Sequence, residues 1–265
     1  MNPLGDPYSV VVRDVIPGKL ENSILIMGFS QYSYLGPLVC DSLSMLLNMR
    51  QVGYLDSDDL RITATTYQGF VMPSVRIMLK RLESGDYDSI LAISSWVELG
   101  IIDPVSKKID PKSVLAYAHA IVDWIKEKEV DVVFAIDTVP SSVPKDITNV
   151  FYVATTREAD EIASKLLKLS PFNGMFKGFY GALLNYGYER NVDLVLLLFP
   201  RSPEISLSSS VIRALHMIGD ITRIEFPEDM LRKIEQDIVN AEETLTRQEK
   251  LRVRVEELRD FTLYR

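Results

Sequence analysis

The chain has 265 residues, of which 47% are apolar and 25% are charged, with 13 glycines and 13 prolines. This is the composition of a folded protein with a sizeable core, and it excludes disordered and fibrous chains. The net charge of −8 argues against nucleic acid and anionic membrane surfaces as partners. Cys40 is the single cysteine and there are two histidines, so the sequence predicts neither a disulfide nor a metal site, and no cofactor.

The compartment is predicted from the N-terminus and from the apolar stretches. The first residues lack the basic start and long apolar run of a signal peptide. No apolar stretch approaches the roughly 20 residues that cross a bilayer. A lone cysteine suits a reducing compartment. We therefore expect a cytoplasmic protein that does not act at a membrane.

Short apolar or β-branched segments alternate with longer amphipathic segments, which is the order expected when helices cover a largely parallel sheet. In chain order, strands are predicted at Tyr8–Val15, Ser23–Met27, Leu60–Thr65, Asp88–Ser94, Asp131–Ile136, Val150–Ala154 and Asp193–Phe199. Helices are predicted at Leu35–Arg50, Pro111–Lys128, Arg157–Leu169, Phe179–Glu189 and Ser208–Met217. The fold class is therefore α/β. Several strands are almost entirely apolar, which is typical of buried parallel strands.

The last segment has a different composition. From 227 to 259 there is no glycine and no second proline, and Glu, Arg, Lys and Gln are dense. Apolar residues recur every three or four positions, at Leu231, Ile234, Ile238, Ala241 and Leu245. The pattern predicts one helix of about 30 residues, roughly 45 Å long, which exceeds the width of such a domain. We divide the chain into a core, 1–226, and a C-terminal helix with its tail, 227–265. The helix either lies over its own domain or presents its end to a partner.

The loop after the second strand is a candidate ligand site. It contains Gly28, Phe29 and Gly36 before a predicted helix, but its glycine spacing is that of no phosphate-binding motif. A strand-to-helix loop at the carboxyl edge of a sheet is nevertheless where α/β proteins usually bind ligands. Glycines in such loops more often simply permit a turn.

Two carboxylates and two histidines are candidate catalytic groups. Glu98 and Asp137 each follow a predicted strand and could face a cleft, although capping of a turn is the more frequent role of such residues. His119 and His216 both lie in apolar helical segments, which favours a structural role. No nucleophile elbow and no zinc-protease motif is present. The sequence therefore designates no catalytic residue.

The carboxyl terminus is more informative. Chain ends are usually polar, because the exposure of apolar side chains to water is unfavourable. Leu263 and Tyr264 are therefore expected to occupy a pocket. A tyrosine ring, its hydroxyl and the terminal carboxylate of Arg265 offer packing, one hydrogen bond and one charge for a lysine. The pocket could belong to another protein or to the chain's own domain.

Several segments together resemble the proteasome assembly chaperone family in its single-chain archaeal form. They are Ile24–Phe29, the helix after Gly36 and Pro37, Phe151–Thr155, Phe176–Leu184, Asn191–Leu198, the helix around Ser208–Met217 and the final helix. The resemblance spans roughly residues 20 to 259. The family's tryptophan-and-acid first loop is replaced here by Phe29-Ser30-Gln31-Tyr32, so the resemblance does not by itself imply a ligand function for that loop.

The resemblance implies a three-layer α/β/α sandwich similar to nucleoside phosphorylases, with a mostly parallel sheet, assembled as a homo-oligomer without established catalysis. It also implies that Leu263-Tyr264-Arg265 is the hydrophobic-tyrosine-any-residue ending that docks between α subunits of the proteasome core. We therefore expect a chaperone or activator of the proteasome. Assembly and gate opening, the number of subunits and the participation of a paralogous chain stay open.

Two alternatives remain. The first is an enzyme of nucleoside-phosphorylase-like or carboxylate-ligase type, acting in the cleft near Gly28–Gly36, Glu98 and Asp137. Its basis is fold analogy, which is a weak guide to function. The second is a self-associating scaffold whose tail completes a neighbour's core.

Overall fold

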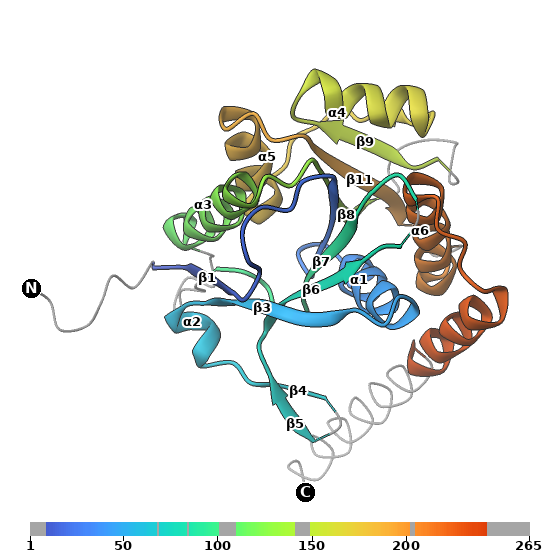
Figure 1. Cartoon of the computed structure of the whole chain (residues 1–265), viewed down its shortest axis with the longest axis horizontal. Coiled ribbons are helices and arrows are strands. Elements are labelled where there is room, and N and C mark those ends of the chain that lie inside the picture. Colours follow the sequence, from blue (N-terminus) through green and yellow to red (C-terminus); the bar gives the residue numbers. More distant parts are fainter. Residues whose placement is uncertain are drawn as a thin grey trace, which may run out of the picture.

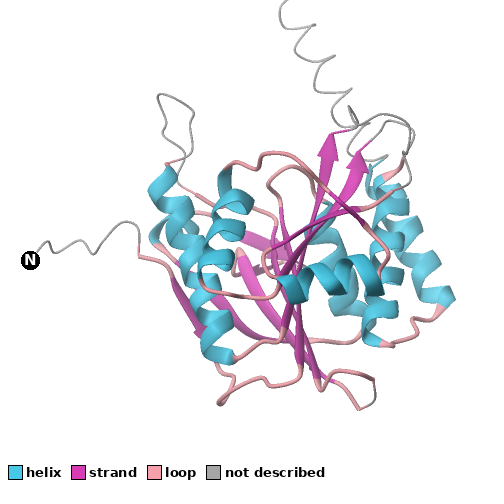
Figure 2. Ribbon diagram, turned by 90° about the horizontal axis from the view of Figure 1, so that it is seen from above, coloured by secondary structure: helices cyan, strands magenta, loops and turns pink. Residues whose placement is uncertain are grey.

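The computed structural model describes residues 9–67, 69–83, 85–100, 110–140, 149–201 and 205–242. A nine-stranded sheet runs through its centre, with helices on both sides (Figures 1 and 2). The strands are β1 (Val11–Asp14), β2 (Ser23–Phe29), β3 (Arg50–Asp56), β4 (Thr65–Tyr67), β5 (Phe70–Met72), β6 (Val75–Arg81), β7 (Ser89–Ser95), β8 (Val132–Pro140), β9 (Phe151–Ala154), β10 (Ser170–Pro171) and β11 (Leu194–Arg201). The helices are α1 (Leu35–Leu46), α2 (Asp58–Arg61), α3 (Pro111–Lys128), α4 (Arg157–Glu161) with the π-helical turn η1 (Ile162–Leu166), α5 (Gly178–Glu189) and α6 (Leu207–Thr222).

The strand order is β1-β3-β6-β7-β2-β8-β11-β9-β10, and β4 pairs with β5 in a separate hairpin. The four central strands, β7, β2, β8 and β11, are parallel to one another. On one flank β1, β3 and β6 pair antiparallel, and on the other β9 runs antiparallel to β11. The predicted α/β class is confirmed, and the parallel part of the sheet is its centre.

Two apolar layers separate the sheet from its helices. Along β2, Leu25 and Met27 face the layer that contains α3 and α5, while Ile24 and Ile26 face the layer that contains α1, α4 and α6. Successive side chains of a strand point to opposite faces, so a strand buried on both sides must be apolar throughout. The three layers, helices, sheet and helices, are seen with the sheet edge-on in Figure 2.

Helix α3 shows how local sequence sets the bounds of an element. The side chain of Asp110 accepts a hydrogen bond from the backbone N–H of Lys112, and Pro111 occupies the first turn, where its missing N–H has no partner to lose. Glu129 ends the helix in a left-handed conformation with φ 54°. The predicted bounds, Pro111–Lys128, are those observed.

Two predicted segments are wrong. Leu60–Thr65 is not one strand: Leu60 and Arg61 belong to the short helix α2, which Ser57 caps by accepting from the N–H of Leu60, and a strand begins only at Thr65. The helix predicted at Leu35–Arg50 ends at Leu46, since Asn48 adopts a left-handed φ of 47° and the chain then enters β3.

The C-terminal helix is described for residues 228–242. Its apolar residues Leu231, Ile234 and Ile238 are buried in the layer formed by α1 and α6. The apolar face predicted from the sequence is thus confirmed for this part. Its continuation and the tail lie outside the described residues, and the division of the chain at 226 stays a prediction.

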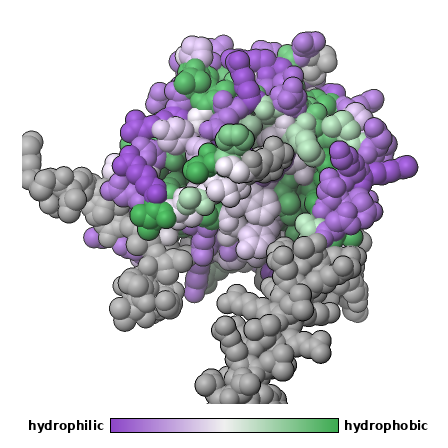
Figure 3. Space-filling view, turned by 90° about the horizontal axis from the view of Figure 1, so that it is seen from below, coloured by the Kyte–Doolittle hydropathy of each residue, from purple (hydrophilic) through white to green (hydrophobic). Residues whose placement is uncertain are grey.

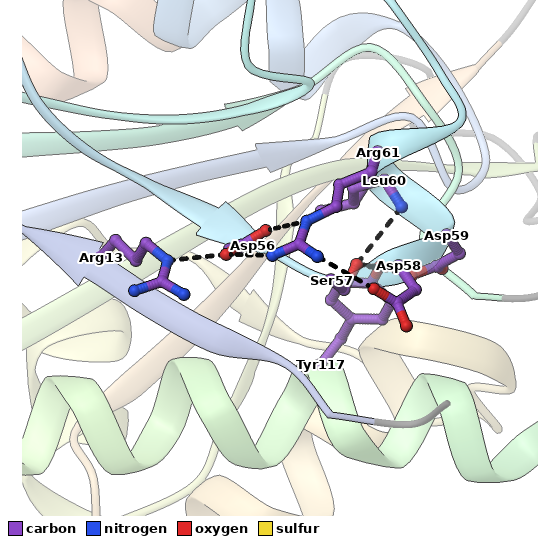
Figure 4. A network of polar contacts seen from close by, with 8 residues as sticks. All are labelled: Arg13, Asp56, Ser57, Asp58, Asp59, Leu60, Arg61 and Tyr117. Carbon is purple, nitrogen blue, oxygen red and sulfur yellow. Dashed lines mark hydrogen bonds and ion pairs between the residues drawn. The ribbon is translucent and has the colours of Figure 1, made fainter. Parts of the chain in front are cut away.

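A polar network fixes the flank of the sheet to helix α3 (Figure 4). Asp56, at the end of β3, accepts from Arg13 at 2.6 Å and from both Nε and a terminal nitrogen of Arg61 at 2.8 Å. The hydroxyl of Tyr117 on α3 lies 2.5 Å from Asp59 and 2.5 Å from Ser57. These residues bind one another and line none of the hollows described below, so their role is structural.

Candidate functional site

A cavity of about 530 Å³ opens at the edge of the sheet where β2, β7, β8 and β11 end. Its lining combines aromatic, polar and charged side chains: Ser30, Gln31, Tyr32, Ser33, Tyr34, Trp96, Glu98, Thr138, Pro200, Arg201, Ile205, Leu207, Ser210 and Glu242. Parallel strands bring their carboxyl ends to one edge, which is where ligands of α/β proteins bind. The loop singled out from the sequence therefore lies at this cavity.

Gly28, Phe29 and Gly36 position this loop from beneath and do not line the cavity. A Cβ on Gly28 would lie 2.0 Å from the carbonyl oxygen of Gly36, and a Cβ on Gly36 would lie 2.6 Å from that of Ile136. The glycines thus allow the start of α1 to press against β2 and β8. Phe29 is buried, with its ring centroid 4.6 Å from that of Phe179. Residues 30–34, between the two glycines, supply the cavity wall.

Asp137 anchors that wall. It lies in β8, is fully buried, and accepts from the Ser33 hydroxyl at 3.0 Å and from the backbone N–H groups of Thr138 at 2.7 Å and Tyr32 at 3.3 Å. Burial raises its pKa to about 7, although these hydrogen bonds and the charge of Arg201 act in the opposite direction. The structure gives this carboxylate the turn-capping role that the sequence favoured, directly below the cavity.

The two ends of the cavity carry opposite charges. Glu98 follows β7, and Gln31 donates to it at 3.4 Å. Arg201 ends β11 and donates to the carbonyl oxygen of Tyr32 at 3.4 Å. Beside Glu98, the rings of Tyr34 and Trp96 are stacked with centroids 5.7 Å apart. The indole N–H of Trp96 donates to Asp41 at 2.7 Å, which fixes the orientation of this ring.

A second hollow, the methionine groove, lies between α1 and the β4–β5 hairpin. It has a volume of about 550 Å³ and is lined by Leu38, Asp41, Ser42, Ser44, Met45, Met49, Thr65, Thr66, Met72, Arg76, Met78 and Trp96. On the hairpin itself, Phe70 is 75% exposed and Val71 is 76% exposed. Figure 3 views this side of the molecule and shows apolar side chains exposed among polar ones. Apolar residues gathered in this way are typical of a protein-binding surface.

The two histidines lie apart from this edge of the sheet. The ring of His119 packs against Tyr186 of α5, with centroids 3.9 Å apart, and His216 lines a surface hollow beside the start of the C-terminal helix. Within the described ranges, no three His, Cys, Asp or Glu residues are grouped so as to hold a metal ion. No described helix has the length and apolarity needed to span a bilayer.

Sequence reasoning identified Glu98 and Asp137 but missed Trp96, Tyr34 and Arg201. A signal for two of them was present, because Trp96 and Arg201 each lie two residues beyond a predicted strand, closer than Glu98, which lies four residues beyond one. The predicted partner-binding residues Leu263, Tyr264 and Arg265 lie outside the described residues.

A family model described as PAC2 family matches residues 25–249. The chain belongs to the PAC2 family. The resemblance derived from the sequence is thereby confirmed, over a span close to the predicted one. Among curated proteins, none matches this sequence significantly.

Solved structures share the fold of this PAC2 protein. PbaA of Pyrococcus furiosus, an archaeal homologue of proteasome-assembly chaperone, aligns with a TM-score of 0.68 and 19% identity over 91% of this chain and 99% of PbaA. PbaB of the same organism, an archaeal proteasome activator, aligns with a TM-score of 0.69 and 14% identity over 91% of this chain and 99% of PbaB. A proteasome-assembly chaperone homologue of Mycobacterium tuberculosis aligns with a TM-score of 0.58 and 14% identity over 83% of this chain and 94% of that homologue. The fold therefore occurs in bacterial as well as archaeal proteins.

Proposed function

We propose that this PAC2 protein is a cytoplasmic proteasome assembly chaperone or activator that docks its C-terminal residues between α subunits of the proteasome core particle. The observation that carries the proposal is the ending Leu263-Tyr264-Arg265 on a chain of the PAC2 family. The fold likeness to PbaA and PbaB, described as a chaperone homologue and a proteasome activator, supports it.

The chemistry of the ending suits a basic, partly apolar crevice. The carboxylate of Arg265 would pair with a lysine, the ring of Tyr264 would pack beside it, and Leu263 would add apolar contact. Because such a short segment buries little area, a single ending binds weakly, and several endings on one particle would raise the avidity. The proposal therefore includes self-association.

Binding to purified proteasome core particles tests the docking step. We expect Tyr264→Ala and a deletion of Leu263–Arg265 each to weaken binding at least tenfold, since an aromatic anchor typically carries a large share of such an interaction. Tyr188→Ala, which removes an exposed tyrosine of α5, is the matched control and should bind like the intact protein. Equal binding by all four proteins would refute docking through the tail.

We place the self-association surface at the β4–β5 hairpin and the methionine groove, with a second copy of this chain as the occupant. A two-stranded hairpin is marginally stable in water, yet this one exposes Phe70 and Val71. The same chain thus carries a protruding apolar hairpin and an apolar hollow, and methionines adapt readily to an inserted side chain. Because Thr65, Thr66 and Met72 of the hairpin line the groove, the two features adjoin each other, and two copies that pair through this one patch would form a two-fold contact.

Particle mass in solution tests this surface. We expect Phe70→Asp to reduce the mass measured by light scattering to that of a smaller assembly, because a charge would be buried in the contact. Met175→Asp changes a side chain that is 80% exposed elsewhere and should leave the mass unchanged. An unchanged mass for both variants, or an intact protein that is already monomeric, would exclude the hairpin as the contact.

A further inference from the structure

The cavity at the carboxyl edge of the sheet offers opposite charges to one small molecule. We propose that it binds a dipeptide-like zwitterion, with a planar organic cation beside Glu98 and a carboxylate at Arg201. This binding site goes beyond the proposed function and does not depend on the C-terminal residues. The proposal rests on the separation of the two charges and on the groups at each end.

The separation follows from the order of the strands. Glu98 follows β7 and Arg201 ends β11, with β2 and β8 between these strands. Three strand spacings amount to about 14 Å between the backbones at the two ends. The two side chains reach inward and shorten this distance. Two extended residues span at most about 7 Å, and a long cationic side chain adds the remainder, so a dipeptide with such a side chain fits the cavity.

The end near Glu98 is suited to a planar cation. The exposed Glu98 accepts from the Gln31 amide at 3.4 Å and makes no ion pair within the part of the chain that the structure describes. The stacked rings of Tyr34 and Trp96 offer an exposed aromatic surface beside it, and a guanidinium binds such a surface while pairing with a carboxylate. Trp96 is already held by Asp41 at 2.7 Å, so little freedom is lost on binding.

The end near Arg201 is suited to a carboxylate. Its guanidinium is exposed and donates to the carbonyl oxygen of Tyr32, and it takes part in no ion pair among the described residues. Arginine binds carboxylates through two parallel hydrogen bonds, so this group recognises an acid far better than an amide. At the opposite end, where the Gln31 amide donates to Glu98, the Oε1 atom of Gln31 is buried without a hydrogen-bond partner in the described structure.

The two charged ends require a ligand that carries both a cation and a carboxylate. Glu98 is the acidic residue at one end of the cavity, and Arg201 is the basic residue at the other. A dipeptide with an N-terminal arginine carries a guanidinium for Glu98 and a terminal carboxylate for Arg201. Arginyl-glycine is thus a suitable probe.

Calorimetric titration of the full-length protein tests the proposal with three probes. Arginyl-glycine should bind, whereas arginyl-glycinamide, which lacks the carboxylate, and citrullyl-glycine, which lacks the guanidinium charge, should each bind at least tenfold more weakly. Arg201→Gln should abolish the preference for the acid over the amide, and Glu98→Gln should abolish the preference for arginine over citrulline. Arg157→Gln, which changes an exposed arginine of α4, should alter neither preference.

Each outcome of these titrations either supports or overturns the ligand proposal. Failure of the intact protein to bind arginyl-glycine at millimolar concentration would overturn the proposal. Preferences that persist in Arg201→Gln and Glu98→Gln would also overturn it, provided that thermal melting shows both variants folded. Proteasome binding by the same variants should be unchanged, because neither residue belongs to the tail. Failure of the ligand proposal is therefore distinguishable from failure of the docking proposal.

Discussion

Gly28→Ala is expected to lower the free energy of unfolding by about 3 kcal/mol or more. The added Cβ would lie 2.0 Å from the carbonyl oxygen and 2.1 Å from the carbonyl carbon of Gly36. Both atoms belong to backbone, so no side-chain rotation can relieve the overlap. Either α1 must move away from β2, or the two central strands must separate, and both changes open the core beneath the cavity.

Denaturant unfolding of Gly28→Ala against the unmodified protein measures this effect. Gly187→Ala is the matched control, since a Cβ there would meet side-chain atoms at 3.4 and 3.8 Å, which is ordinary contact. Because Gly187 lies within helix α5, its replacement by alanine should stabilise the protein by about 0.5–1 kcal/mol. Similar stability of the two variants would show that the contact between Gly28 and Gly36 is not tight.

Asp137→Asn is expected to change how stability depends on pH. The carboxyl has a pKa of about 7 in the folded protein against an ordinary 3.8 because burial disfavours its charged form. Its contribution to stability is therefore fully present below the unfolded pKa and is lost as pH rises through about 7. Each pH unit between the unfolded and the folded pKa lowers the free energy of unfolding by about 1.36 kcal/mol. About 3 kcal/mol of stability is therefore lost between pH 5 and pH 8.

Asparagine keeps the shape and most acceptors of the protonated carboxyl but cannot ionise. The unmodified protein should therefore lose stability relative to Asp137→Asn by about 3 kcal/mol as pH rises from 5 to 8. Urea unfolding at the two pH values measures the difference. Parallel pH profiles for Asp137→Asn and the unmodified protein would contradict the prediction.

The central elements were predictable because their signals are local or strongly periodic. Strands β2, β8 and β11 are buried on both faces, so their sequences are continuously apolar. Helix α3 has an amphipathic sequence with a proline in its first turn, and its bounds were predicted without error. The apolar stripe of the C-terminal helix likewise identified Leu231 and Ile234 as core residues.

The antiparallel flank was harder to predict because its strands are buried on one side. In β6, buried Val75, Ile77 and Leu79 alternate with partly exposed residues, so a strand signal was present and was overlooked. Strand β3 has two exposed residues at its start and an irregular register between Gln51 and Gly53, which weakens the alternation. Segment Leu60–Thr65 has strand-like composition, but the cap at Ser57 favours a short helix that includes Leu60 and Arg61, and β4 begins only at Thr65.

The candidate site was predictable only in part, since its residues come from strands that are distant in sequence. Glu98 and Asp137 were recognised as strand-end carboxylates. That Glu98 and Arg201 face each other across one cavity depends on the order β7-β2-β8-β11, and no local pattern encodes that order. The buried role of Asp137 likewise depends on the turn at Tyr32 and Ser33 folding over it.

The short strand β10 limits how copies of this protein can associate. It forms one end of the sheet order, has two residues, and the second is Pro171, which carries no N–H. An edge of this kind offers almost no backbone N–H donors for hydrogen bonds to a strand of a neighbouring chain, so the sheet cannot be extended there by β-augmentation. Assemblies that meet at this end must recognise one another through side chains, and their affinity is then open to adjustment by single substitutions.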